Sequence, residues 1–132
     1  MRKKPCLTAA VCAAALILMG AMPGDKGVMS KEGAYTVVNT TSIAQNVEGY
    51  AGPTPLKIYI KKGKVDKIEA LKNDETPKYF AKVKKTLLTK WNGMTVKAAR
   101  NAKVDAVTGA TYSSSAVIEN VRRGLEYYQK HK

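Results

Sequence analysis

Residues 56–71 read LKIYIKKGKVDKIEAL, and this stretch decides the fold class. Every second residue from Leu56 to Ile60 is apolar, which is typical of a strand with one buried face. Lys62-Gly63-Lys64 turns the chain, and the returning run slips out of strict alternation near Lys67. The stretch predicts an antiparallel β-hairpin with one apolar face and one face of lysines. The apolar residues of the returning run are Val65, Ile68, Ala70 and Leu71.

The chain before the hairpin is also strand-like, after a short aperiodic segment. Residues 35–38, Tyr-Thr-Val-Val, are rich in β-formers, and residues 42–50 are expected to form another strand. That strand ends at a Gly/Pro cluster over residues 49–53, which indicates a turn or a close approach of the backbone. Residues 25–33 are small, charged and without periodicity, so we expect a linker there.

A helix is expected directly after the hairpin. Thr76 suits the N-cap and Pro77 the first helical position, and the helix is expected to end near Asn92-Gly93. Residues 94–101 are expected to add a short helical piece. The apolar residues of the first helix recur at helical spacing and are Phe80, Val83, Leu87, Leu88 and Trp91.

A last helix is expected toward the end of the chain. Ser113-Ser114-Ser115 supplies N-cap candidates, and the buried stripe after them is Ile118, Val121, Leu125 and Tyr128. Strands followed by helices predict an α+β fold, in which helices pack on an antiparallel sheet.

Residues 1–24 look like a targeting segment rather than part of the fold. Three basic residues precede an uncharged run from Cys6 to Met22, which is the pattern of a secretory signal. About 20 apolar residues can also span a bilayer. The segment is therefore expected to be either a signal peptide or an N-terminal membrane anchor, followed by a linker over 25–33 and a domain over 34–132. The domain is expected to be exported, to the periplasm or the outer face of the cytoplasmic membrane.

Composition excludes several classes of site. Cys6 and Cys12 both lie in the targeting segment, so the exported domain is expected to lack disulfides and thiolate metal sites. His131 is the only histidine, which argues against histidine-based metal sites and Ser-His-Asp catalysis. The net charge is +13, which attracts anionic partners, but the lysines are spread along the chain. We interpret them as a solvated surface, and we expect no nucleic-acid partner because we expect the domain to be exported.

Residues 105–113, DAVTGATYS, carry the candidate chemistry. Gly109 allows a turn or a close approach to a ligand, and Ala110 adds almost no bulk. A helix that starts after them presents unpaired N–H groups and a partial positive charge, which suits a phosphate. Nearby hydroxyls can hydrogen-bond such a group. From these residues alone, a strand-to-helix turn with surplus capping residues explains the stretch at least as well.

The segment Asp105-x-x-Thr108-Gly109-Ala110-Thr111 resembles the flavinylation motif of the FMN-binding domain family. That family includes the C subunit of the sodium-pumping NADH:quinone reductase and the G subunit of the Rnf complex. Two more segments are similar to the family in order and spacing, namely residues 49–52 before the hairpin and Glu75-Thr76-Pro77 after it. The resemblance covers roughly residues 47–128, and the respiratory-complex subunits are longer than this chain.

The resemblance implies FMN as cofactor, joined by a phosphoester to Thr111. It also implies an FMN transferase that uses FAD as donor and reads Asp105, and it places Glu75 near the flavin ring. Trp91 lies on the apolar side of its helix, so we expect it to pack in the core rather than on the flavin. The other residues expected to bind the cofactor are Thr76, Thr108, Gly109, Ala110, Tyr112 and Ser113.

The sequence thus predicts an exported electron carrier or redox subunit rather than a stand-alone enzyme. Its partners are expected to be the transferase and an unidentified redox protein, with a membrane-bound one among the candidates. Two alternatives stay open. One is a module that binds FMN without a covalent bond, and the other is a secreted basic interaction domain without flavin.

Overall fold

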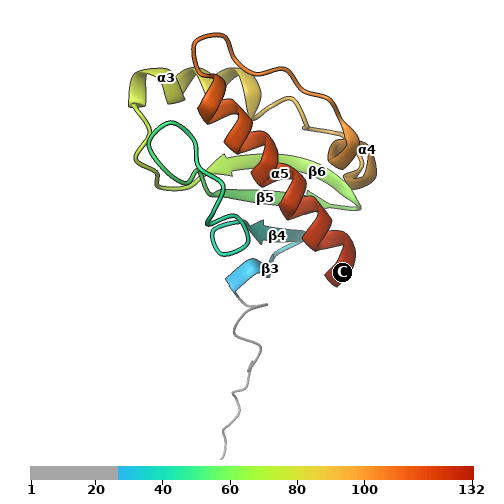
Figure 1. Cartoon of the computed structure of the whole chain (residues 1–132). Helices are drawn as coiled ribbons and strands as arrows, with labels where there is room; N and C mark the ends of the chain where they lie inside the picture. Colours follow the sequence, from blue (N-terminus) through green and yellow to red (C-terminus); the bar gives the residue numbers. More distant parts are fainter. Residues whose placement is uncertain (1–26) are drawn as a thin grey trace, which may run out of the picture.

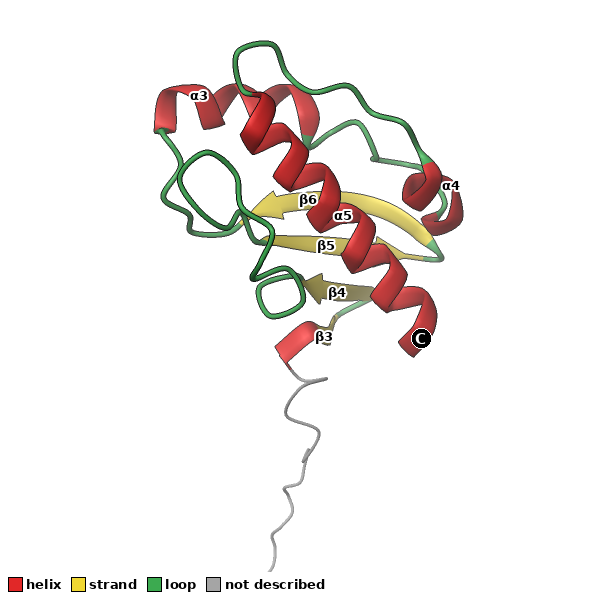
Figure 2. Ribbon diagram, viewed as in Figure 1, coloured by secondary structure: helices red, strands yellow, loops and turns green. Residues whose placement is uncertain are grey.

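The computed structural model describes residues 27–132, so the predicted targeting segment 1–24 lies outside the described part of the chain. An antiparallel four-stranded sheet in the order β3-β4-β5-β6 forms one layer, and helix α5 runs across it (Figures 1 and 2). The α+β prediction is confirmed. The strands are β3 (Met29–Glu32), β4 (Tyr35–Asn39), β5 (Leu56–Lys61) and β6 (Lys64–Ala70). The helices are α3 (Pro77–Lys82), the π-helix η1 (Val83–Leu87), α4 (Val96–Asn101) and α5 (Thr111–His131).

The predicted hairpin is formed by β5 and β6. Its two-residue turn, Lys62-Gly63, has positive φ at both positions, as a type I′ turn requires. The predicted slip near Lys67 is a β-bulge. Because the bulge adds a residue to β6, Val65 and Ile68 are both buried in the core although they are three residues apart.

Two segments before the hairpin differ from the expectation. Residues 29–32, expected in a linker, form β3, and all four pair with residues of β4. Pairing with a neighbouring strand, which local composition does not predict, orders them. Residues 42–50, expected as a strand, instead form turns and one isolated bridge. Asn39 Oδ1 accepts a hydrogen bond from Thr41 N at 3.0 Å, and Ala44 N donates to Thr40 O at 3.0 Å, and such local bonds compete with strand pairing.

The predicted helix after the hairpin is present, but it is not one regular α-helix. Its N-cap is Thr76, as predicted, and after α3 the chain widens into η1, where Leu88 N donates to Val83 O at 3.3 Å. The predicted short helical piece is α4. The side chain of Thr95 caps it by accepting a hydrogen bond from Ala98 N at 3.1 Å. None of the helices described between residues 27 and 132 is long and apolar enough to cross a membrane.

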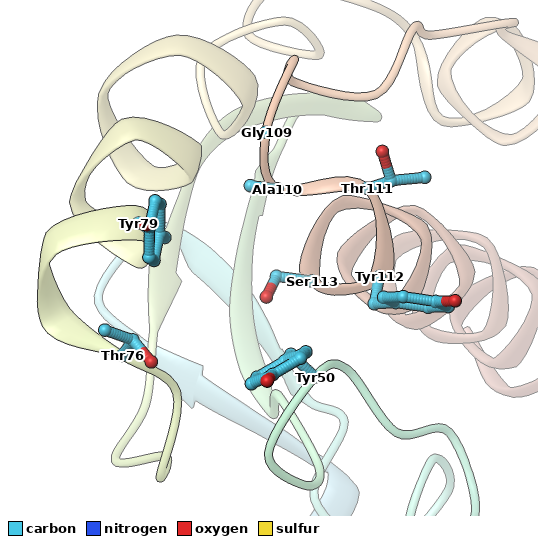
Figure 3. Close-up of a pocket in the computed structure, with 8 residues that line it drawn as sticks. All are labelled: Tyr50, Thr76, Tyr79, Gly109, Ala110, Thr111, Tyr112 and Ser113. Atoms are coloured by element: carbon cyan, nitrogen blue, oxygen red, sulfur yellow. The ribbon is translucent and has the colours of Figure 1, made fainter.

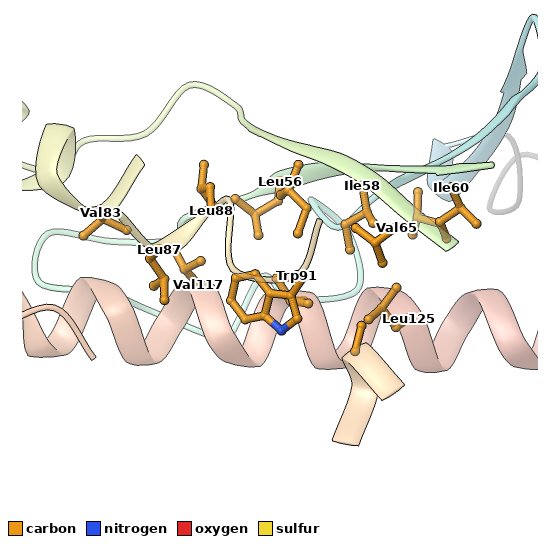
Figure 4. Close-up of a cluster of buried hydrophobic side chains, with 14 of the residues drawn as sticks. Leu56, Ile58, Ile60, Val65, Val83, Leu87, Leu88, Trp91, Val117 and Leu125 are labelled. Atoms are coloured by element: carbon orange, nitrogen blue, oxygen red, sulfur yellow. The ribbon is translucent and has the colours of Figure 1, made fainter. Parts of the chain in front are cut away.

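The core lies between α5 and the sheet (Figure 4). A Cβ at Gly124 would lie 2.6 Å from Cδ1 of Ile58 and 3.0 Å from Cγ2 of Thr40, so glycine allows α5 to cross this closely. Trp91 is 1 % exposed and belongs to this core, as predicted. The other large side chains that are fully buried are Val37, Val38, Leu56, Ile58, Ile60, Val65, Val83, Leu87, Val117, Val121 and Leu125.

Candidate functional site

A pocket of about 330 Å³ lies at the N-terminal end of α5 (Figure 3). One wall is the first turn of α5 with the turn before it, and the other is the start of α3. In Figure 3, Thr76 and Tyr79 lie across the hollow from the start of α5. The volume is within the usual range for small-molecule sites. The lining residues are Tyr50, Thr76, Tyr79, Gly109, Ala110, Thr111, Tyr112 and Ser113.

The turn that leads into α5 explains the order Gly-Ala-Thr. Gly109 has φ +86°, a left-handed conformation that favours glycine. Ala110 is 7 % exposed and packs in the hydrophobic core, where a larger side chain would have to displace its neighbours. Thr111 is the first residue of α5 and is exposed. The local fold therefore requires a left-handed backbone conformation at Gly109 and a small buried side chain at Ala110, and it leaves the side chain of Thr111 exposed to solvent.

Helix α5 begins two residues before the predicted caps. The N-cap is Ala110, which has no capping side chain, so the three serines lie inside the first turns. The Ser114 hydroxyl accepts a hydrogen bond from Val107 N at 3.0 Å. The Ser113 hydroxyl donates to the carboxylate of Glu75. The serines thus fix the turn before α5 and the wall of the pocket, and they do not cap the helix.

The start of α5 is suited to an anion. The first helical bond is Ser114 N to Ala110 O at 2.9 Å, so the N–H groups of Thr111, Tyr112 and Ser113 have no acceptor within residues 27–132. No acidic residue lies in this first turn, and no lysine or arginine lines the pocket. An anion here would be held by backbone N–H groups, hydroxyls and the helix dipole. In the described chain no three His, Cys, Asp or Glu side chains are grouped to hold a metal ion.

Three exposed tyrosines are among the residues that line the pocket. Tyr50, Tyr79 and Tyr112 are 76 %, 47 % and 71 % exposed, and they are the large hydrophobic side chains that remain exposed among the described residues. Such side chains gathered at one hollow indicate a ligand site. Figure 3 shows Tyr50 and Tyr79 beside the hollow and Tyr112 projecting from the opposite side of the start of α5. Aromatic faces stack well on planar rings, so the pocket can bind a planar aromatic ligand.

Glu75 joins two parts of the pocket wall. It is 5 % exposed, and its Oε1 accepts hydrogen bonds from Tyr50 N, at 2.9 Å, and from the Ser113 hydroxyl. Its Oε2 accepts a hydrogen bond from Ala51 N. The carboxylate therefore ties the loop that carries Tyr50 to the first turn of α5. Gly49 permits this contact, because a Cβ there would overlap Oε1 and lie 3.2 Å from Cα of Ser113.

The structure brings most of the predicted site residues together. Six of them line the pocket: Thr76, Gly109, Ala110, Thr111, Tyr112 and Ser113. Glu75 is not among the lining residues and instead supports the wall by its hydrogen bonds. Asp105 and Thr108 are exposed on the segment that leads to the turn and do not line the pocket.

Tyr79 lines the pocket, and the sequence did not single it out. The position of Tyr79 in the sequence indicates such a contact, because it lies outside the apolar stripe of the predicted helix, three residues after Thr76 and next to the buried Phe80. A large aromatic residue on the polar side of a helix that starts near a candidate site is a useful indicator of a ligand contact.

Residues 49–126 match the FMN-binding domain in the comparison with protein families, and the comparison with curated proteins finds no match. The matched range contains every residue that lines the pocket. FMN combines a phosphate with a planar ring system, and the pocket offers unpaired N–H groups for the first and tyrosines for the second. The chain belongs to the FMN-binding domain family, and FMN is its cofactor.

Proposed function

We propose that the chain is an extracytoplasmic electron-transfer protein that carries FMN through a phosphoester to Thr111. The observation that carries this proposal is the position of Thr111, exposed at the first residue of α5 among three N–H groups without a protein acceptor. The structure records no hydrogen bond of the Thr111 hydroxyl with any residue from 27 to 132. The hydroxyl is therefore free to react, and the helix start would stabilise the phosphodiester charge that results.

The chain's own residues would bind and orient the cofactor. FMN supplies the redox chemistry when bound, and the protein supplies position and electrostatics. The N–H groups of Thr111, Tyr112 and Ser113 suit the phosphate, and Tyr50 and Tyr79 suit the ring. No basic side chain is needed in the pocket, because the helix start provides the positive potential.

Attachment requires a separate FMN transferase with FAD as donor. In that reaction the Thr111 oxygen attacks the FMN phosphorus of FAD, the pyrophosphate bond breaks, AMP leaves and the hydroxyl proton is released. Asp105 and Thr108 are exposed on the segment just before the turn and do not line the pocket. A transferase can therefore contact these two side chains without entering the pocket. Their exposure supports a role in transferase recognition.

An extracytoplasmic location is supported by residues 1–24, whose basic start and apolar run have the pattern of an export signal or anchor. A covalent bond has a clear advantage there, because a cofactor that dissociates outside the cytoplasm is lost by dilution. The function that follows is the transfer of electrons between partners, with no substrate chemistry of the chain's own.

The test uses the full chain co-expressed with an FMN transferase, with intact mass and in-gel flavin fluorescence measured after denaturation. We expect an FMN-sized mass gain and fluorescence in the parent and none in Thr111→Ala. Ser115→Ala is the matched control, because Ser115 is an exposed hydroxyl of the same helix start that does not line the pocket. It should keep the adduct.

Two results would contradict the covalent proposal. Flavin that copurifies with both the parent and Thr111→Ala, and leaves both on denaturation, would indicate a non-covalent FMN module. A parent without any flavin, beside a transferase shown to modify another substrate, would favour a basic interaction domain.

A further inference from the structure

The helical segment beside the pocket carries a set of lysines that we call the lysine patch. It lies on α3, η1 and the turn that follows, and all of its side chains are exposed. None of them forms an ion pair with a residue in the described part of the chain. Residues 76–90 contain no aspartate or glutamate. The patch consists of Lys78, Lys82, Lys84, Lys85 and Lys90.

The patch borders the flavin pocket directly. Lys78 precedes Tyr79, which lines the pocket, and Lys82 lies about one turn after Tyr79 on α3. The opposite side of this segment is held in the core, where Phe80 and Val83 are 4 % and 0 % exposed. Because the buried side fixes the segment, the lysines form a positively charged surface at a set position beside one wall of the pocket.

Several other basic residues of the domain are paired with neighbouring carboxylates. On the outer side of α5, Arg122 and Arg123 contact Glu119 at 2.5 Å and 2.9 Å, and Arg100 contacts Glu126 at 2.9 Å. The lysine patch has no such partners. Near it the sequence offers Asp74 and Glu75, and Glu75 is buried and hydrogen-bonded to the loop at residues 50–51. The five charges of the patch are thus not balanced by neighbouring carboxylates, and they lie beside one wall of the pocket.

We infer that the lysine patch is the docking surface for an acidic electron-transfer protein. The inference rests on the proposed function, since it assigns a partner to the flavin site. Charge of one sign steers an oppositely charged partner and raises the association rate by 10 to 1,000-fold at low salt. A partner that docks on α3 and η1 is held beside Tyr79, which brings its redox centre close to the flavin pocket.

The test measures electron transfer from the flavin-loaded, full-length protein to two probes. The protein is reduced with dithionite, the excess is removed, and stopped-flow absorbance follows the reduction of a soluble acidic b5-type cytochrome or a basic c-type cytochrome. Each two-electron-reduced flavin reduces two ferric haems and releases its protons to the solvent. The rate is measured from low to high ionic strength, after intact mass has confirmed flavin loading in every variant.

The variants separate the patch from overall charge. The patch variant is Lys78→Glu with Lys82→Glu and Lys85→Glu. The control is Lys62→Glu with Lys97→Glu and Lys132→Glu, which makes the same change in net charge at exposed lysines near the C-terminal end of α5. None of these three control lysines forms an ion pair within the described chain.

We expect the low-salt rate with the acidic cytochrome to fall about tenfold in the patch variant and less than twofold in the control. The rate with the basic cytochrome should rise in the patch variant, and high salt should remove both effects. Equal slowing in the two triple variants, or no salt dependence in the parent, would overturn the inference. So would loss of binding to anionic phosphatidylglycerol vesicles in the patch variant with unchanged cytochrome rates, because the patch would then serve a membrane surface. A parent without flavin would contradict the proposed function instead.

Discussion

Replacement of Glu75 by glutamine tests whether one carboxylate holds the pocket wall together. A glutamine has one carbonyl oxygen, so it can keep at most the two hydrogen bonds made at Oε1, from Tyr50 N and the Ser113 hydroxyl. Its amide NH₂ would then face Ala51 N, which donates to Oε2 in the parent. Two donors cannot satisfy each other, so this bond is lost and the loop moves or takes up water.

The cost follows from the kind of bond that is lost. A hydrogen bond to a charged acceptor contributes about 1.5–3 kcal/mol, and water can reach this loop because Ala51 is exposed. We therefore expect Glu75→Gln to lower the free energy of unfolding by about 1.5–2 kcal/mol. For a domain of this size that corresponds to a fall in Tm of about 10 °C.

Trp91 provides the assay. It is the sole tryptophan and is 1 % exposed, so its fluorescence in urea reports unfolding of the core. The flavin-free protein is used, because the flavin would otherwise contribute to the signal. Asp74→Asn is the matched control, since Asp74 is the neighbouring exposed carboxylate and accepts no hydrogen bond within the described chain. If both variants unfold within 0.5 kcal/mol of the parent, a threshold typical of surface changes, Glu75 does not stabilise the wall.

Three further changes test other parts of the fold, each by urea unfolding. Gly109→Ala should cost about 1 kcal/mol through backbone strain alone, because φ is +86° and nothing lies within 4 Å of the new Cβ; an unchanged midpoint would contradict this. Gly124→Ala should cost about 1–3 kcal/mol because Ile58 Cδ1 must move, and no cost would show that α5 shifts freely. Arg122 hydrogen-bonds Glu119 and holds the pKa of this carboxyl below its ordinary value of 4.5, with a second hydrogen bond from Arg123. This stabilisation is present above pH 4.5 and is lost as the pH falls below it. Glu119→Gln should therefore lower the free energy of unfolding by less than about 1 kcal/mol at pH 7 and leave it unchanged in acid. A loss of stability that persists in acid would refute this reasoning.

The sequence predicted best where local patterns and tertiary packing agree. The hairpin over residues 56–71 has both the apolar alternation and the turn residues that its structure requires. The break in this alternation near Lys67 corresponds to the β-bulge. Trp91 was assigned to the core because it shares a helical stripe with other apolar residues. The segment Gly109-Ala110-Thr111 was singled out by its small residues before a helix, and it lies in the pocket.

The differences from prediction have two causes, long-range pairing and local hydrogen bonds that turn the chain. Nothing in residues 29–32 resembles a strand by composition, and they become one because β4 offers a free edge. Residues 42–50 have strand-like composition, but side-chain and backbone hydrogen bonds near Thr40 turn the chain first. The role of Glu75 was equally hidden, because its donors are 24 to 38 residues away in the sequence. A single sequence does not show which distant N–H group a carboxylate will meet.

The length of α5 has a practical consequence. The helix has 21 residues and therefore extends about 30 Å. Thr111 begins it, while Tyr128 and His131 at its other end line a hollow together with Met29, close to where the described chain starts. Anything joined upstream of residue 27, whether a tether, a label or a solid support, thus connects to the domain about one helix length from the pocket. A protein immobilised through that end would leave the pocket at the start of α5 accessible to molecules in solution.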